Sequence, residues 1–269
     1  MGKIKAACFV GILFFSTIPF ADSVHADQLL VMAFNDTTSK PWKWKDNGKY
    51  IGPFIDVIQE VADRSGIKVM LVPLPWKRAL KMIEEGTIDG SFGGYKTPER
   101  EAFAVFLDTP LSWAVLSIFV RKGEEFSFQK IEDLYGKRIG IVRGYTTSEE
   151  FDHAMKEGMI PVSESGNYGS LVKMLDGKRI EAIAGVTSTL QAHFADMNLT
   201  ERFVRLPHPI TAPKPIYICV SKKSKIFNRE KTIAKMNQAM KDMEQENVFE
   251  KISQKYGYNK CIIFGCILK

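Results

Sequence analysis

The feature that most constrains this chain is a regular alternation of apolar, strand-like runs with amphipathic, helix-like runs. Residues 28–34 (QLLVMAF) predict a strand, residues 52–66 predict a helix, and residues 67–74 predict a second strand. The same order continues through a helix that stops at Gly86 and onward to a long helix over 230–255. Strands separated by helices of about ten residues indicate an α/β fold with parallel strands.

The first 26 residues have the three parts of a secretory signal peptide. Lys3 and Lys5 form a basic head, residues 6–20 form an apolar run, and small residues precede a cleavage site after Ala26. The competing interpretation, a membrane anchor, requires about 20 apolar residues, and this run is shorter. The pattern therefore predicts export, with a mature chain that begins near Asp27.

Charge and cysteine content argue against several functional classes. The net charge of +6 is spread along the chain, which indicates a solvated surface and no nucleic-acid partner. Cys219 lies in an apolar run and is expected to be a buried small hydrophobe, whereas Cys261 and Cys266 could pair in an oxidising compartment. No His or Cys cluster has metal-ligand spacing and no common catalytic motif is present, so neither a metal nor a cofactor is predicted.

Two loops that follow predicted strands have the composition of an anion site. Residues 92–100 (FGGYKTPER) and 143–150 (RGYTTSEE) both combine glycine, tyrosine, threonine and arginine at a helix start. Thr97 and Pro98 predict an N-cap and a first helical position, so Arg100 adds a cation where the helix dipole is already positive. A ligand carboxylate would offset this local cost. A structural salt bridge or plain exposure of Arg100 is the competing interpretation.

Tryptophans at loop edges are the second feature with a binding interpretation. Trp42 follows Pro41 early in the chain, and Trp76 directly follows a predicted strand end, where ligands bind in open α/β sheets. A tryptophan in such a position also commonly plugs the core. Asp36 ends the first predicted strand and could bind a cationic group or cap a turn.

Several segments resemble, in the same order, the extracellular solute-binding proteins of family 3, the periplasmic receptors of polar amino-acid ABC importers. They are GPFIDVIQEVADRSG, PWKRALKMIEEGTIDGSFGGYKTPEREAFAVFLDTPL, LYGKRIGIVRGYTTSEEF, GKRIEAIAG and NVFEKISQKYGY, of which residues 75–111 are the most specific. The resemblance implies a two-lobed periplasmic-binding-protein fold (type II), with two mixed sheets flanked by helices and joined by two crossing segments. The implied lobes cover 27–113 and 212–260 for the first and 114–211 for the second, with a tail of unknown role over 261–269.

The resemblance also implies positions for ligand contacts. In family members an arginine after the Thr-x-x element binds the ligand carboxylate, and an aromatic residue stacks on the ligand side chain. These roles correspond to Arg100 and Trp76, and backbone groups of the preceding loop correspond to residues 93–95. The predicted ligand-binding residues are Asp36, Trp42, Trp76, Gly93, Gly94, Tyr95, Arg100, Arg143, Thr146, Thr147 and Val186.

Two departures from the family pattern bear on the ligand. Amino-acid receptors carry an acid for the α-ammonium where this chain has Val186, and the loop before Arg100 is one residue shorter, with Gly-Gly where serines are common. Without that acid, Arg100 and Arg143 favour a carboxylate-bearing solute over an ordinary α-amino acid.

The leading functional hypothesis is a monomeric periplasmic receptor for a small polar carboxylate-bearing solute, an amino acid or a related compound. It would close on the solute by a hinge and deliver it to an inner-membrane ABC permease, without catalysis. The alternative is an enzyme on the same fold, similar to cyclohexadienyl dehydratase, which would need a general acid that the sequence does not identify. A sensor module that presents the ligand to a membrane kinase is a third interpretation.

Overall fold

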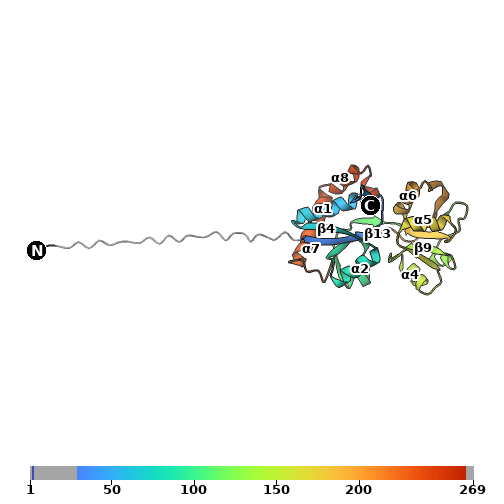
Figure 1. Cartoon of the computed structure of the whole chain (residues 1–269), viewed down its shortest axis with the longest axis horizontal. Helices are drawn as coiled ribbons and strands as arrows, with labels where there is room; N and C mark the ends of the chain where they lie inside the picture. The colour runs from blue at the N-terminus through green and yellow to red at the C-terminus, as the bar shows by residue number, and fades with distance from the viewer. Residues whose placement is uncertain (1, 3–28, 265–269) are drawn as a thin grey trace.

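The described chain forms two lobes that lie side by side (Figure 1). The computed structural model describes residues 2 and 29–264, so most of the predicted signal peptide, and Cys266 in the tail, lie outside the described residues. One sheet has the strand order β4-β1-β5-β13-β6 with β7 beside β13, and the other has the order β10-β9-β11-β8-β12. Both sheets combine parallel and antiparallel pairs, which confirms the prediction of two mixed sheets.

The first lobe combines early and late parts of the chain. Its strands are β1 (Leu29–Asn35), β4 (Lys68–Leu74), β5 (Gly90–Tyr95), β6 (Ala104–Phe106), β7 (Ser112–Ala114) and β13 (Lys214–Ser221), with a hairpin of β2 (Trp44–Asp46) and β3 (Lys49–Ile51). Its helices are α1 (Pro53–Ser65), α2 (Trp76–Glu85), α3 (Pro98–Glu101), α7 (Arg229–Gln245), α8 (Val248–Lys255) and α9 (Lys260–Phe264).

The second lobe is formed by the middle of the chain. Its strands are β8 (Leu116–Arg121), β9 (Ile139–Val142), β10 (Val162–Ser165), β11 (Ala182–Val186) and β12 (Phe203–Pro209). Its helices are α4 (Glu149–Lys156), α5 (Tyr168–Asp176) and α6 (Thr187–Asp196), with 3₁₀ turns at Ile131–Leu134 and Thr200–Arg202. The chain passes between the sheets twice, from β7 into β8 and from β12 into β13.

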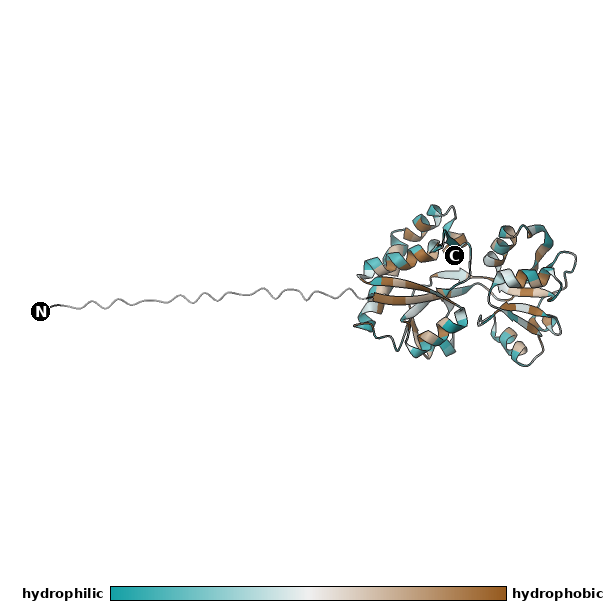
Figure 2. Cartoon of the chain, in the orientation of Figure 1, coloured by the Kyte–Doolittle hydropathy of each residue, from teal (hydrophilic) through white to brown (hydrophobic). Residues whose placement is uncertain are grey.

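Local signals explain where the principal helices begin and end. Helix α1 starts with Pro53 and stops at Gly66, and α2 stops at Gly86; both glycines are left-handed, with φ of 67° and 76°. The apolar side chains of α1 face the sheet of the first lobe, and Figure 2 shows the brown strands of both lobes lying inside the teal outer surfaces of the helices. Apolar burial between sheet and helices therefore holds each lobe together.

Three segments differ from the sequence prediction. The long helix expected over 230–255 is divided into α7 and α8, because Asn247 adopts a left-handed conformation (φ 57°) and interrupts the hydrogen-bond ladder. The expected loop at 93–95 continues strand β5, because β13 pairs with it through Tyr95. The four prolines of residues 206–215 exclude a helix or a central strand and predict a linker between the lobes, and the structure places the end of an edge strand, β12, in this stretch.

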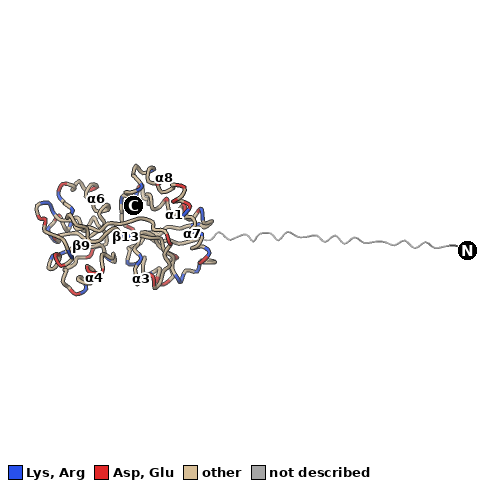
Figure 3. Tube along the Cα trace, turned by 180° about the vertical axis from the view of Figure 1, so that it is seen from behind, with Lys and Arg blue, Asp and Glu red and all other residues tan. Residues whose placement is uncertain are grey.

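Basic and acidic residues are mixed along the outer helices and loops of the two lobes (Figure 3). Within the part of the chain that the structure describes, no helix combines the length and the apolar character needed to cross a bilayer. Cys219 is buried in β13 beside Ser91, as expected for a small hydrophobe.

Candidate functional site

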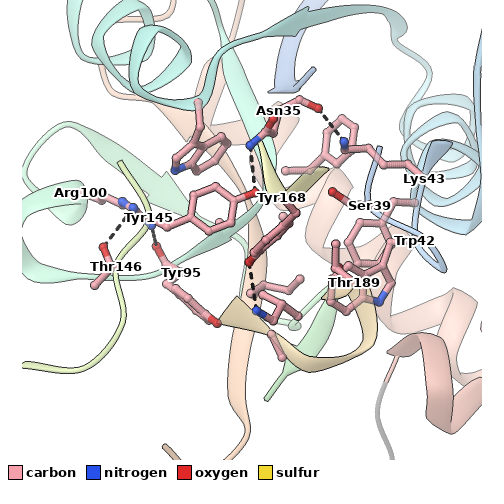
Figure 4. Close-up of a pocket in the computed structure, with 18 residues that line it drawn as sticks. Asn35, Ser39, Trp42, Lys43, Tyr95, Arg100, Tyr145, Thr146, Tyr168 and Thr189 are labelled. Carbon is pink, nitrogen blue, oxygen red and sulfur yellow. Dashed lines mark hydrogen bonds between the residues drawn. The ribbon is translucent and has the colours of Figure 1, made fainter. Parts of the chain in front are cut away.

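A pocket lies between the lobes, at the end of the sheets where β1, β5, β9 and β11 finish. It encloses about 700 Å³ of empty space, its open mouth included. Its lining residues are Asn35, Ser39, Trp42, Lys43, Phe54, Trp76, Phe92, Gly93, Gly94, Tyr95, Arg100, Ala114, Tyr145, Thr146, Tyr168, Val186, Thr189 and Ile216. Aromatic rings from both lobes form much of the wall, and the polar groups among them are few (Figure 4).

The guanidinium of Arg100 is the dominant charged group at one end of the pocket. Thr97 caps the single turn of α3 and accepts a hydrogen bond from the Arg100 amide, so that the side chain of Arg100 turns inward and is only 7% exposed. Its Nη1 donates to the Tyr95 carbonyl oxygen at 2.9 Å, and its Nη2 donates to Thr146 Oγ1 at 3.3 Å. Burial lowers the pKa of Arg100 from its ordinary value. These two contacts use two of five N–H donors, so donors remain for a ligand.

The ring of Trp76 lies against the Arg100 guanidinium at this end of the pocket. The guanidinium carbon of Arg100 lies 5.7 Å from the centre of the Trp76 ring, within the range of a cation–π contact. Gly94 is required beside the ring, because a Cβ at this position would lie 2.8 Å from Trp76 Cζ2. The glycine predicted to approach a ligand thus also makes room for the aromatic platform.

Tyrosines of the second lobe close the middle of the pocket. Asn35 Nδ2 donates to Tyr145 Oη at 2.9 Å across the lobes, and the Val186 amide donates to Tyr168 Oη at 3.0 Å. Burial raises the pKa of Tyr145 to about 12 and raises the pKa of Tyr168 further above its ordinary value, so both phenols stay neutral. Val186 lines the pocket with an apolar side chain, at the position where amino-acid receptors of the family pattern carry an acid.

A second polar group of side chains lies at the opposite end. Lys43 is 6% exposed, and its Nζ donates to the carbonyl oxygens of Asn35 and Thr37, both at 2.6 Å. Burial lowers the pKa of Lys43 to about 7. Ser39 and Thr189 line the same end and are also buried.

None of the described lining residues is Asp, Glu or His, and no group of three metal-ligating side chains occurs within residues 29–264.

The structure brings most of the predicted ligand-binding residues together. Eight of them line the pocket: Trp42, Trp76, Gly93, Gly94, Tyr95, Arg100, Thr146 and Val186. Three are placed outside it. Asp36 is exposed at the surface, Arg143 is exposed and pairs with Glu164 at 3.2 Å, and Thr147 is buried but is not among the lining residues.

Local bonding explains these three positions. The Asp36 carbonyl oxygen accepts a hydrogen bond from the Tyr50 hydroxyl, and its amide donates to Leu74. The Thr147 amide donates to the Asp152 carboxylate, at 3.2 Å to the nearer oxygen. Arg143 follows β9 but points toward β10, whose Glu164 neutralises it.

Sequence reasoning missed lining residues that have no distinctive local pattern. They are Asn35, Ser39, Lys43, Phe54, Phe92, Ala114, Tyr145, Tyr168, Thr189 and Ile216. Tyr145 lies in the second glycine loop and was within reach of the same argument as Thr146. Lys43 could not be identified in this way, because a lysine between two tryptophans is most simply interpreted as an exposed residue.

The fold and the pocket define a two-lobed binding protein with its site between the lobes. The chain belongs to the bacterial extracellular solute-binding proteins, family 3, whose sequence model matches residues 30–259. This confirms the resemblance drawn from the sequence.

Individual relatives are distant but cover most of the chain. The arginine-binding extracellular protein ArtP of Bacillus subtilis is 21% identical over 218 residues, 81% of this chain and 82% of that protein. A solved ancestral arginine-binding protein bound to arginine is 26% identical, with a TM-score of 0.74 over 87% of this chain and all of that chain. An ancestral amino acid-binding protein, a precursor of cyclohexadienyl dehydratase, shares the fold at 23% identity and a TM-score of 0.68, over 85% of this chain and 95% of that chain.

Proposed function

We propose that this chain is a periplasmic receptor of an ABC importer that captures a small carboxylate-bearing solute, an amino acid or a related compound. The carrying observation is the buried guanidinium of Arg100, in a pocket whose described lining holds no carboxylate. A buried charge of this kind is costly unless it is paired, so a ligand carboxylate is its natural partner. Membership of a solute-binding family and relatives named as amino-acid-binding proteins support this reading.

We further propose that the chain moves as two lobes, 27–113 with 212–260 and 114–211, about the two crossing segments. The cross-lobe bond between Asn35 and Tyr145 would then form as the lobes close over the solute. By analogy with the family, the receptor would deliver its solute to an inner-membrane permease, and the predicted signal peptide supports a periplasmic location. We also propose that the receptor is a monomer.

A binding role is favoured over catalysis. A dehydratase on this fold needs a general acid, and the titratable lining groups are Arg100, Lys43 and the phenols of Tyr95, Tyr145 and Tyr168. Burial raises the pKa of each of these phenols, which makes them weak proton donors near neutral pH. Lys43, whose pKa is lowered to about 7, is the better proton donor, but its Nζ already donates to the Asn35 and Thr37 carbonyl oxygens. Incubation with prephenate, followed by a search for an aromatic product, tests the alternative directly.

The proposal is tested by a thermal-shift screen of the mature protein against amino acids, dicarboxylates and amines, repeated with Arg100→Gln. Loss of a buried charge-assisted contact costs about 2–5 kcal/mol, which corresponds to roughly 30-fold weaker binding or more. The ligand-induced rise in Tm is therefore expected to disappear in Arg100→Gln and to persist in Arg78→Gln, a matched change on the exposed side of α2. An unchanged rise in Arg100→Gln would contradict the proposal.

A further inference from the structure

We propose that the pocket takes a solute with an acidic group at each end, one held by Arg100 and the other by a second anion subsite formed by Lys43, Ser39 and Thr189. This inference rests on the proposed function and specifies its substrate class as short dicarboxylates. It differs from what the relatives' names describe, because arginine would bring cationic groups into a pocket that already contains two cations.

The first argument is the position of the Lys43 ammonium. In its protonated form the buried Nζ donates to two main-chain carbonyl oxygens, those of Asn35 and Thr37, and keeps a third N–H donor on a residue that lines the pocket. An anion bound beside it would favour this protonated form. Carbonyl oxygens solvate an ammonium but do not neutralise it. The acid that acts on its charge, Asp36, is exposed and outside the lining, so a ligand anion would complete the charge balance on the pocket side.

The second, independent argument is Thr189 at the start of α6. Its side chain is 1% exposed, and its Oγ1 is buried without a hydrogen-bond partner among the described residues. Buried hydroxyls are rarely left unpaired, so this one indicates a missing ligand group. Helix α6 has ten residues and begins after Val186 without a side-chain cap. Its Thr187 amide donates to the Val115 carbonyl oxygen at 2.9 Å, and the positive end of the helix dipole favours an anion over a cation. Ammonium recognition at this point would require the acid that Val186 replaces.

The third argument is the separation of the two charged ends. Figure 4 shows Arg100 and Thr146 at one side of the pocket and Lys43, Ser39 and Thr189 at the other, with the rings of Tyr145 and Tyr168 between them. The loop that carries Ser39 is tied to α6 across the lobes, because Lys40 pairs with Asp196 at 2.9 Å. The second subsite is therefore assembled from both lobes, as the first is by Arg100 and Thr146.

The test compares dicarboxylates with monocarboxylates of the same carbon number, namely glutarate with pentanoate and adipate with hexanoate, by isothermal titration calorimetry at pH 6, below the pKa of Lys43 of about 7. At least one dicarboxylate is expected to bind tenfold or more tightly than its monocarboxylate partner. Lys43→Met is expected to reduce that ratio by tenfold or more, and Lys49→Met, an exposed lysine of the nearby hairpin, is expected to preserve it.

Lys43 also holds two main-chain carbonyls, so folding of Lys43→Met is first checked by its unfolding transition. Thr189→Val, which keeps the side-chain shape and removes the hydroxyl, provides a second variant and is expected to lower the same ratio. Equal binding of both acid classes, or an unchanged ratio in Thr189→Val and in folded Lys43→Met, overturns the second subsite alone. Tighter binding of L-arginine than of any dicarboxylate also overturns it. Failure of every carboxylate to bind overturns the proposed function as well.

Discussion

At the scale of single residues, a substitution at Gly94 tests how tightly the Arg100 end of the pocket is packed. Its missing Cβ would lie 2.8 and 2.9 Å from two atoms of the Trp76 ring and 3.7 Å from Arg100 Nη1. Gly94→Ala is therefore expected to lower the free energy of unfolding by about 1–3 kcal/mol through overpacking, and to weaken carboxylate binding by displacing the ring. Gly166→Ala is the matched control, because no atom lies within 4 Å of a Cβ there. Chemical denaturation measures the free energy of unfolding of both variants, and equal values would contradict the packing argument.

Lys43 gives a residue-scale prediction on pH. Its pKa is lowered to about 7 in the folded protein and returns toward 10.5 in the unfolded chain, so the unfolded chain binds more protons between these values. Stability should therefore rise with pH above 7, by at most about 1.4 kcal/mol per pH unit. Asp36 opposes the shift, and the Tyr50 phenol beside the ammonium has a raised pKa and stays neutral up to pH 9.

The measurement is urea denaturation of the ligand-free protein at pH 7, 8 and 9, compared with Lys43→Met. The difference in unfolding free energy between the two proteins should change in favour of the wild type as pH rises, since other titrating groups cancel in the comparison. The carbonyls left without a donor in Lys43→Met add an offset that does not depend on pH. A difference that is constant with pH would show that the lysine is not buried as described.

The sequence identified Arg100 at one end of the pocket but not Lys43 and Thr189 at the other. Arg100 could be singled out because it violates a local rule, a cation in the first turn of a helix, and such violations indicate a nonlocal reason. Lys43 and Thr189 violate nothing locally. Their burial depends on how the loop at 36–43 meets α6 of the other lobe, which no short-range pattern encodes.

At the scale of secondary structure, α9 contacts residues that line the pocket, on the side away from the cavity. The carbonyl oxygen of Ile263 accepts hydrogen bonds from Trp42 Nε1 at 2.9 Å and from Ser112 Oγ at 2.5 Å. The Phe264 ring stacks on that of Phe54, with centroids 6.3 Å apart. Since Trp42 and Phe54 line the pocket, the segment that had no functional interpretation in the sequence supports two pocket-lining rings.

Phe264→Ala is accordingly expected to reduce stability by about 3 kcal/mol, at the lower end of the range for buried Phe because a one-turn helix can relax. The matched control is Ile262→Ala on the same helix, whose side chain is 55% exposed. Differential scanning calorimetry and a carboxylate titration of both variants provide the readout. Equal Tm and affinity in the two variants would mean that α9 does not brace the pocket.

Elements with local boundary signals were predicted well, and those set by tertiary context were not. Helices α1 and α2 end at left-handed glycines, Gly66 and Gly86, which are visible in the sequence. The break between α7 and α8 depends on Asn247 taking a left-handed conformation, which its residue type permits but does not require. Helix α6 was missed because its start carries no capping side chain.

At the scale of the whole molecule, the contacts between lobes surround the pocket on several sides. Asn35 bonds to Tyr145 from one direction, and the Lys214 ammonium donates to the Thr147 carbonyl oxygen at 3.2 Å from another. His193 Nε2 lies 3.1 Å from the Thr38 carbonyl oxygen near the second subsite. Each contact is modest in energy, which is compatible with the hinge motion proposed above, in which a ligand shifts the balance between open and closed lobes.

Tyr145→Phe tests this balance, because it removes the cross-lobe bond to Asn35 while keeping the ring in the pocket. A single hydrogen bond contributes about 0.5–1.5 kcal/mol, so the ratio of closed to open molecules should fall roughly 2- to 13-fold. Small-angle X-ray scattering of the ligand-free proteins should then give a larger radius of gyration for Tyr145→Phe than for the wild type.

Tyr135→Phe, which removes a hydroxyl from an exposed ring of the same lobe, controls for the chemical change. Identical scattering from both variants would mean that the lobes do not exchange between open and closed arrangements through this contact, and hinge closure would need a different basis.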